Sequence, residues 1–186
     1  MKASRQQTIE GREIRVYDDL LSMQVIYALT DMLDKGEFTR SEWARDDTKS
    51  VRHWALNLSV EMATRLPVYE QTLRAIEDFD PSSAYRIYRS YCNHSSYGDM
   101  LFTHTDSRPG EKGLTALWYI APIWDFEWGG ETLFFNSSND AEAVVSPKPG
   151  RLVIFDGSIV HAGRPPTRIC HAPRYTLAYK FDHVVA

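Results

Sequence analysis

The sequence contains only two cysteines, Cys92 and Cys170, in 186 residues. Two cysteines are too few for a disulfide-stabilised scaffold, and such low usage is typical of proteins from a reducing compartment. No apolar run reaches the roughly 18 residues that a membrane-spanning helix needs. The stretch MKASRQQTIEGREI also lacks the apolar segment of a secretory signal. We therefore expect a cytoplasmic protein with no membrane partner.

The sequence also lacks an excess of basic residues. It has 21 Lys and Arg against 25 Asp and Glu, a net charge of −4, which disfavours long-range attraction to a nucleic-acid backbone. Hydrophobic residues make up 43% and charged residues 25%, close to the globular average, which excludes a disordered or collagen-like chain. No linker or internal repeat divides the chain, so we expect one domain over residues 1–186.

Hydrophobic periodicity divides the chain into a helical first part, about residues 1–82, and a stranded second part from about residue 83. An apolar stripe predicts a helix over 20–33 with its N-cap at Asp18 or Asp19, and a second helix begins at Pro67 and ends before Pro81. The polar segment 37–52 is expected to be a partly ordered loop. Strands are predicted over 85–92, 114–121, 131–135, 151–155, 158–161 and 174–181. The absence of βαβ alternation indicates an α+β fold, mainly β, in which an antiparallel sandwich or barrel carries the helices on one side.

One constellation of residues points to chemistry. His104 and Asp106 lie two residues apart, a spacing that places both side chains on one face of a strand. Such a triplet also occurs by chance in exposed loops, so alone it is a weak signal. His161 ends another predicted strand and offers a third ligand. Two imidazoles and one carboxylate form a facial triad with open coordination positions, which suits Fe(II) better than the tetrahedral sites that zinc prefers.

With this triad, the sequence resembles the Fe(II)/2-oxoglutarate-dependent dioxygenases, in particular their prolyl-hydroxylase-like branch. The resemblance covers about residues 85–182 and rests on five elements in the family's order: YCNHSSYGDMLFTHTD, LTALWYIA, WGGETLFF, PKPGRLVIFDGSIVHAG and PRYTLAYKF. It implies a double-stranded β-helix, or jelly roll, over about residues 83–182. It also implies that His104, Asp106 and His161 bind Fe(II).

The resemblance further implies contacts with the co-substrate, 2-oxoglutarate. Arg174 is similar to the family arginine that pairs with the distal carboxylate, a role for which a planar, permanently charged guanidinium is suited. Tyr91 and Tyr119 match positions whose hydroxyls bind the co-substrate, while the alternative for each is packing in the core. Tyr97 lies seven positions before His104, a longer interval than in the eukaryotic prolyl hydroxylases, so the register of Tyr91 depends on an insertion.

The activity implied is an oxygenase reaction that consumes O2 and 2-oxoglutarate and releases succinate and CO2. It would hydroxylate or desaturate an unactivated C–H bond of a small molecule, an amino acid or a peptidyl residue. Related halogenases have Gly or Ala at the carboxylate position, so Asp106 favours hydroxylation or desaturation. One alternative is an AlkB-like demethylase of nucleic acid, where Lys180 would replace the second arginine of that family's motif. The other is a metal-binding jelly-roll module without catalysis.

The sequence does not identify the substrate. We expect a small-molecule or peptidyl partner, no nucleic acid, and a monomer or homodimer. The polar segment 39–53, with Arg45, Arg52 and His53, is a candidate cover for the mouth of the site, and the alternative is a solvated face. The same two interpretations apply to Arg108, Glu111 and Lys112 after the metal motif.

Overall fold

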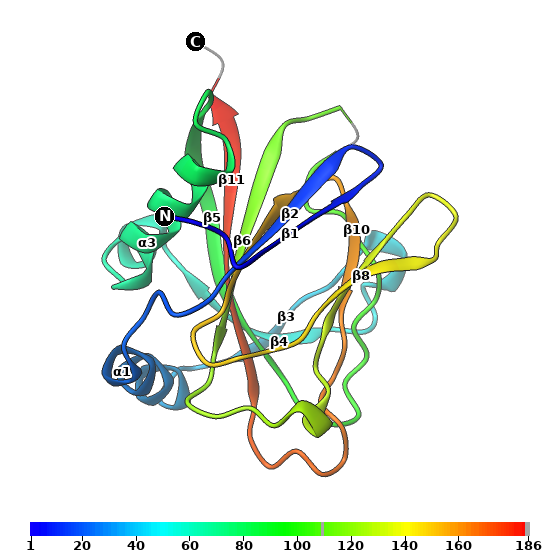
Figure 1. Ribbon diagram of the computed structural model, residues 1–186. Helices are drawn as coiled ribbons and strands as arrows, with labels where there is room; N and C mark the ends of the chain where they lie inside the picture. Colours follow the sequence, from blue (N-terminus) through cyan, green and yellow to red (C-terminus); the bar gives the residue numbers. More distant parts are fainter. Residues whose placement is uncertain (109, 185–186) are drawn as a thin grey trace.

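The computed structural model describes residues 1–108 and 110–184, and a large antiparallel sheet forms its framework (Figure 1). The large sheet has the order β1 (Arg5–Ile9), β2 (Arg12–Tyr17), β9 (Leu152–Asp156), β6 (Gly113–Ile120), β11 (Arg174–Val184), β5 (Ala84–Ser95), β4 (His53–Leu58) and β3 (Thr39–Glu42). A small sheet has the order β10 (Val160–Gly163), β7 (Thr132–Phe135) and β8 (Ala141–Val145). The two sheets form the jelly roll that the family resemblance implied.

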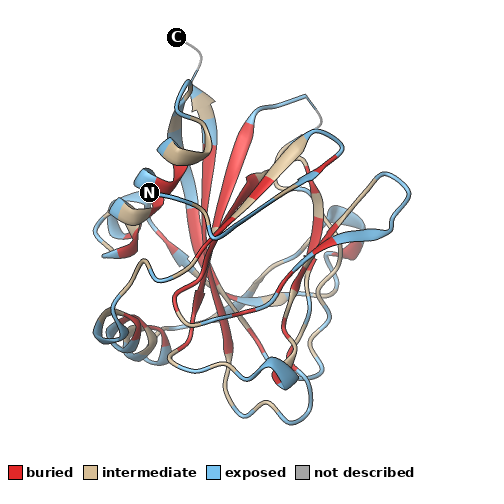
Figure 2. Cartoon of the chain, viewed as in Figure 1, coloured by how far each residue is buried: buried red, intermediate tan, exposed pale blue. Residues whose placement is uncertain are grey.

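Side-chain alternation along the central strands gives the large sheet two different faces. On β6, Trp118 belongs to a core shared with the helices, whereas its neighbour Tyr119 belongs to a second core shared with the small sheet. On β11, Leu177 and Tyr179 belong to the helical side. The intervening residues of β11 therefore point into the jelly roll, where polar side chains gather. Figure 2 shows that these central strands are buried along most of their length.

Three helices lie on one side of the large sheet: α1 (Met23–Asp34), α2 (Val60–Thr64) and α3 (Val68–Phe79) (Figure 1). Helix α3 begins directly after Pro67 and ends at Asp80, as its apolar stripe predicted. The N-cap of α1 is Ser22, whose Oγ accepts the Val25 N–H, rather than Asp18 or Asp19. None of the helices among the described residues has the length and apolar character to cross a membrane.

The first part of the chain is less helical than the sequence predicted. It contributes four strands to the large sheet, and two of them, β3 and β4, lie in or next to the segment expected to be a loop. Glu10 and Gly11 both have positive φ and join β1 to β2 in a tight hairpin turn. The strands β1 to β4 lie at or near the two ends of the large sheet, where polar side chains face water. Their composition therefore shows the alternating pattern of a strand less clearly. Strand β8 was missed as well.

The six predicted strands of the second part are all present as β5, β6, β7, β9, β10 and β11. Two short 3-10 turns, η1 (Asp46–Thr48) and η2 (Phe126–Trp128), complete the described elements. The jelly roll therefore assembles from the strongly apolar runs that the sequence shows most clearly. Its interior is the space in which the candidate site lies.

Candidate metal centre

Backbone hydrogen bonds bring the three triad residues together from two segments. His104 and His161 form an isolated antiparallel bridge, in which each backbone N–H donates to the carbonyl of the other residue at 3.0 and 2.9 Å. The Asp106 N–H donates to the Gly157 carbonyl at 2.7 Å, which ties the motif to the turn that precedes β10. The imidazole rings consequently lie side by side, with their centroids 4.4 Å apart.

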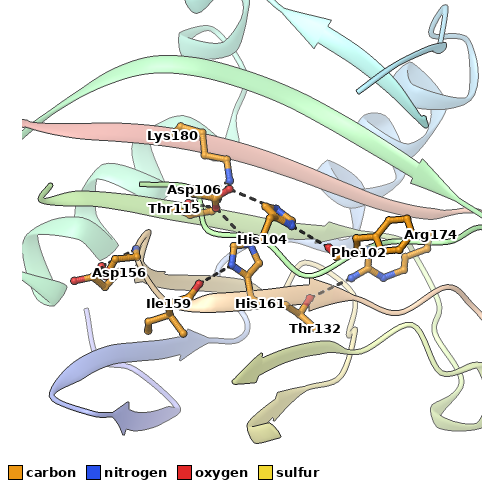
Figure 3. Close-up of polar contacts among 11 residues, drawn as sticks. Phe102, His104, Asp106, Thr115, Thr132, Asp156, Ile159, His161, Arg174 and Lys180 are labelled. Atoms are coloured by element: carbon orange, nitrogen blue, oxygen red, sulfur yellow. Dashed lines mark hydrogen bonds and ion pairs between the residues drawn. The ribbon is translucent and has the colours of Figure 1, made fainter. Parts of the chain in front are cut away.

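The ligand atoms of the triad converge on one point (Figure 3). Asp106 Oδ1 is 3.6 Å from His104 Nε2, and Asp106 Oδ2 is 3.4 Å from His161 Nε2. Adjacent ligands of an ion with bonds of about 2.1 Å lie about 3 Å apart, so this spacing suits one divalent ion. Two nitrogens and one oxygen on a single face match the donor set of a facial triad.

Each imidazole is oriented by a carbonyl two residues before it. His104 Nδ1 lies 3.1 Å from the Phe102 oxygen, and His161 Nδ1 lies 2.9 Å from the Ile159 oxygen. Nδ1 therefore donates its proton to the backbone, and the lone pair of Nε2 faces the centre, which is the arrangement of a metal-ligating histidine. Burial lowers the pKa of His104, and it lowers the pKa of His161 to about 3. Both rings are neutral near pH 7, as metal binding requires.

A buried lysine contacts the carboxylate of the triad. Lys180 and Thr115 are cross-strand neighbours on β11 and β6. The Lys180 ammonium and the Thr115 hydroxyl both donate to Asp106 Oδ2, the hydroxyl at 2.6 Å. Burial alone would raise the pKa of Asp106, but Lys180 and the two imidazoles lower it below the ordinary value. With Oδ2 occupied in this way, Oδ1 is the oxygen that is free to bind an ion.

Sequence reasoning missed this role of Lys180. Lys180 was considered only as a possible substitute for a second arginine that contacts nucleic acid, yet its side chain is buried against Asp106. A signal existed, because residues 174 and 180 are six apart and so lie on the same face of one strand. What the sequence could not supply was the position of Asp106 opposite that face.

Arg174 is the other buried cation on this face of β11, and only 3% of its surface is exposed. Its Nε donates to the Gly130 carbonyl at 2.5 Å, and its two terminal nitrogens lie 3.2 Å from Thr132 Oγ1 and 3.4 Å from Thr176 Oγ1. The structure gives it no ion pair with any described residue. A Cβ at Gly130, where φ is +80°, would lie 3.1 Å from Arg174 Cδ, so this close approach requires glycine.

The two tyrosines lie at different ends of this arrangement. Tyr91 lines the cavity near Lys180, whose Nζ is 5.6 Å from the centre of its ring. The Arg174 guanidinium lies 5.4 Å from the ring centre of Tyr119, whose hydroxyl contacts Thr132 Oγ1 at 2.6 Å and the Val145 carbonyl at 3.1 Å. Tyr119 is buried and its hydroxyl is occupied by protein partners, so in this geometry it orients Arg174 and Thr132. A direct contact of either tyrosine with the co-substrate stays a prediction.

One cavity joins the metal centre to Arg174. It has a volume of about 60 Å³, and its walls include His104, His161, Arg174 and Lys180. Residues of the metal end and of the guanidinium end therefore line one continuous space. His53 also lines this cavity, so part of the segment expected at the mouth does reach it.

The other residues expected at the mouth are distributed differently. Arg45 donates to the backbone carbonyl and the hydroxyl of Thr103, directly before the metal motif. Arg52 lines a second cavity next to the first. Arg108, Glu111 and Lys112 are exposed in the connection from β5 to β6, and they do not belong to the described walls of either cavity.

Comparison with known proteins agrees with this geometry. Residues 90–181 match the family model of the 2OG-Fe(II) oxygenase superfamily, and this range contains the complete triad, Arg174 and Lys180. A search of the curated proteins finds no match.

Solved structures show the same fold at low sequence identity. A prolyl-4-hydroxylase from Pseudomonas putida is 17% identical, with a TM-score of 0.62 and 91% of each chain covered. HygX from Streptomyces hygroscopicus, solved with nickel and 2-oxoglutarate, is 12% identical with a TM-score of 0.66, covering 91% of this chain and 82% of that one. A collagen prolyl hydroxylase from Paramecium bursaria Chlorella virus-1 is 15% identical with a TM-score of 0.64, covering 100% and 97%. From its family match, its jelly roll and its convergent His-Asp-His triad, the chain belongs to the 2OG-Fe(II) oxygenase superfamily.

Proposed function

We propose that this protein hydroxylates or desaturates an unactivated C–H bond of a small molecule, an amino acid or a peptidyl residue, with 2-oxoglutarate as co-substrate. His104, Asp106 and His161 hold Fe(II) through Nε2, Oδ1 and Nε2. The observation that carries the proposal is the buried guanidinium of Arg174, which has no carboxylate partner among the described residues and lines one cavity together with His104 and His161.

The protein's own residues position the co-substrate. A buried guanidinium with neutral partners favours a carboxylate strongly, because charge-assisted hydrogen bonds gain strength where water is excluded. Arg174 therefore binds the distal carboxylate of 2-oxoglutarate, and the Thr132 hydroxyl beside it supplies a further polar contact. Gly130 and Tyr119 hold the guanidinium in place for this contact.

The triad and its neighbours orient the reaction and exclude water. Bound Fe(II) supplies the activation of dioxygen, with 2-oxoglutarate converted to succinate and CO2. Lys180 and Thr115 fix one oxygen of Asp106 and leave the other for the ion. His161 is 6% exposed, which keeps the reacting centre away from bulk solvent. The chain needs no additional acid or base for this chemistry.

The setting and partners of the reaction form part of the same proposal. Cys92 and Cys170 are both free, which supports a cytoplasmic location. A structure of HygX holds hygromycin B, and a prolyl hydroxylase from Trichoplax adhaerens was solved with a peptide fragment. These structures support either a small-molecule or a peptidyl substrate for this fold. We propose that the protein acts as a monomer or homodimer and does not act on nucleic acid.

An anaerobic titration of the metal-free protein with Fe(II) and 2-oxoglutarate tests this function. We expect a visible metal-to-ligand charge-transfer band that is absent in Asp106→Ala and strongly weakened in Arg174→Ala. On admission of oxygen the band should decay while succinate forms. If metal binds but no band appears, the triad does not chelate the keto acid, and the protein is a metal-binding jelly roll instead.

A further inference from the structure

Two buried polar atoms in the wall of the metal cavity have no hydrogen-bond partner among the described residues. They are Asn93 Oδ1 and His53 Nε2, and both residues line the same cavity as His104 and His161. Buried polar atoms in folded proteins are normally paired, so an unpaired one marks a place for a ligand. Asn93 is the cross-strand neighbour of Thr176 and so faces the part of the cavity next to Arg174. His53 lies on β4 and, unlike Asn93, also lines a second cavity.

His53 forms the boundary between the metal cavity and a second, larger one. The second cavity has a volume of about 240 Å³, and His53 and Leu101 belong to the walls of both. Its other walls come from Arg40 of β3, from Arg52 in the connection between β3 and β4, from His94 of β5 and from the segment around Asp99. A molecule in this outer cavity therefore lies next to the metal centre, with the imidazole of His53 between the two spaces.

Two arginines that line the outer cavity, Arg40 and Arg52, have no acidic partner among the described residues. Arg40 lies over the ring of Trp54 at 5.3 Å, and Arg52 lies over the ring of Trp43 at 5.9 Å. Neither guanidinium makes a hydrogen bond or ion pair with another residue in the described part of the chain. Stacking on tryptophan fixes a guanidinium plane while leaving its N–H groups available.

Other arginines on the same hairpin and on β5 differ in this respect. Arg45 pairs with Asp47 at 3.0 Å, and Arg89 pairs with Glu42 at 2.6 Å. Among the described residues that line the outer cavity, Asp99 is the one with a carboxylate, and it already accepts the Ser96 N–H at 2.8 Å. The cavity therefore has an excess of positive charge in a chain whose net charge is −4.

We propose that the outer cavity binds the prime substrate through a carboxylate held by Arg40 and Arg52, and that the substrate also forms a hydrogen bond with His53 Nε2. This inference rests on the proposed function, because it places the C–H bond to be oxidised on the metal side of His53. Guanidinium groups recognise carboxylates by paired hydrogen bonds, so the substrate class is a small organic acid, such as an amino acid or a peptide with a free carboxylate. The acid group is anchored on one side of His53, and the reacting carbon reaches the metal on the other.

The test uses two probes that differ only in charge, N-acetylglycine and N-acetylglycinamide. The full chain is loaded with Zn(II) and with N-oxalylglycine, an unreactive analogue of 2-oxoglutarate that occupies the Arg174 end. Each probe is then titrated at constant ionic strength while the backbone amide NMR signals of Arg52, His53 and Asp99 are followed. We expect saturable shifts with the acid and at least tenfold weaker binding of the amide.

Three variants assign the effect. Arg40→Gln combined with Arg52→Gln should weaken the acid at least tenfold and remove its advantage over the amide. Asp99→Asn should tighten acid binding about twofold, because it removes a like charge. Arg65→Gln is the matched control, since Arg65 is exposed and pairs with Glu61 away from both cavities, and it should leave binding unchanged.

The outcomes separate this proposal from the proposed function. Equal affinities for acid and amide, no saturable shift below roughly 100 mM probe, or binding that survives the double substitution would each overturn the carboxylate subsite. Failure of Zn(II) or N-oxalylglycine to bind would instead contradict the proposed function. That failure is detected before any probe is added.

Discussion

Strand β11 carries two buried cations on one face, six residues apart, and their surroundings differ. Lys180 is 5% exposed and forms an ion pair with Asp106. Arg174 is 3% exposed, and its hydrogen-bond partners are a backbone carbonyl and two threonine hydroxyls. Both sites bury a full positive charge in the same jelly roll, but the protein supplies a counter-charge at only one of them (Figure 3).

The difference separates a structural charge from a ligand-binding charge. Burying a charge is costly unless an opposite charge and hydrogen bonds compensate for it. Lys180 is compensated by Asp106, so it belongs to the framework of the metal centre. Burial lowers the pKa of Arg174, but a guanidinium stays protonated. The proposed co-substrate would supply this missing counter-charge through its distal carboxylate.

The largest effect is expected from Asp106→Ala, which removes a metal ligand and also leaves Lys180 unpaired. We expect the charge-transfer band to disappear. We also expect the metal-free protein to lose about 3–5 kcal/mol in its free energy of unfolding, the usual consequence of breaking a buried ion pair. Urea denaturation of the metal-free protein measures this loss.

The double variant Asp106→Ala, Lys180→Met shows whether the loss comes from the orphaned charge. Methionine has a similar length without the charge, so most of the stability should return while metal binding stays absent. A double variant that is no more stable than Asp106→Ala would show that Lys180 is not held by charge pairing, and the contrast with Arg174 would then fail.

Arg174→Gln should weaken co-substrate binding without destabilising the metal-free protein. The affinity for 2-oxoglutarate should fall at least about a hundredfold, because an anion loses a buried charged partner. Affinity for the metal alone should stay the same. Since no described residue pairs with its charge, the unfolding free energy of the metal-free protein should stay constant or rise. A clear loss of stability with unchanged co-substrate affinity would mean that Arg174 is a framework residue like Lys180.

The sequence predicted the chemistry of this face better than its electrostatics. The spacing of His104 and Asp106, the position of His161 at a strand end and the place of Arg174 after it are local patterns. The structure brings His104, Asp106 and His161 together, and both histidines line one cavity with Arg174. The pairing of Lys180 with Asp106 joins residues 74 positions apart. Such a contact depends on strand register, which a single sequence does not reveal.

The fold shows the same difference between local patterns, which the sequence reveals, and strand pairing over long distances, which it does not. Helix α3 and the central strands have strong apolar periodicity, and both were predicted. Strands β3 and β4 lie at one end of the large sheet and contain residues such as Arg40 and Asn57 that face water. The polar composition of segment 37–52 predicted a loop where β3 lies. No strand was predicted over 53–58, although backbone pairing with β5 makes β4 a strand. His53 was named as a candidate at the mouth, but its place between two cavities follows only from this pairing.

Lowering the pH should have an intermediate effect on stability, because the imidazoles of His104 and His161 are neutral in the folded protein. The pKa of His161 is lowered by burial from its ordinary 6.5 to about 3, so between these values the unfolded chain binds a proton that the folded chain does not. Stability therefore falls as the pH decreases through this window. From pH 6.5 to about pH 5 the metal-free protein should lose about 1.6 kcal/mol from His161.

Urea denaturation of the metal-free protein at several pH values measures this slope, and His161→Gln is the matched variant. It should flatten the pH dependence in this window, although burial of His104 contributes in the same direction. The lowered pKa of Asp106 acts only at lower pH, around and below its ordinary value of 3.8. An unchanged slope in His161→Gln would mean that this imidazole is protonated in the folded protein.

The smallest effects come from the two threonines that support the two cations, and they test the comparison most directly. Thr115 donates to Asp106 beside Lys180, and Thr132 lies 3.2 Å from an Arg174 nitrogen. Thr115→Val should weaken metal binding about three- to tenfold and leave the affinity of the metal-loaded protein for 2-oxoglutarate nearly unchanged. Thr132→Val should do the reverse, because each variant removes hydrogen bonds at one of the two sites only, and each such bond is worth about 1 kcal/mol. The charge-transfer band measures both affinities. If both variants weakened the binding of metal and of 2-oxoglutarate equally, Lys180 and Arg174 would act as one unit rather than as a framework charge and a ligand-binding charge.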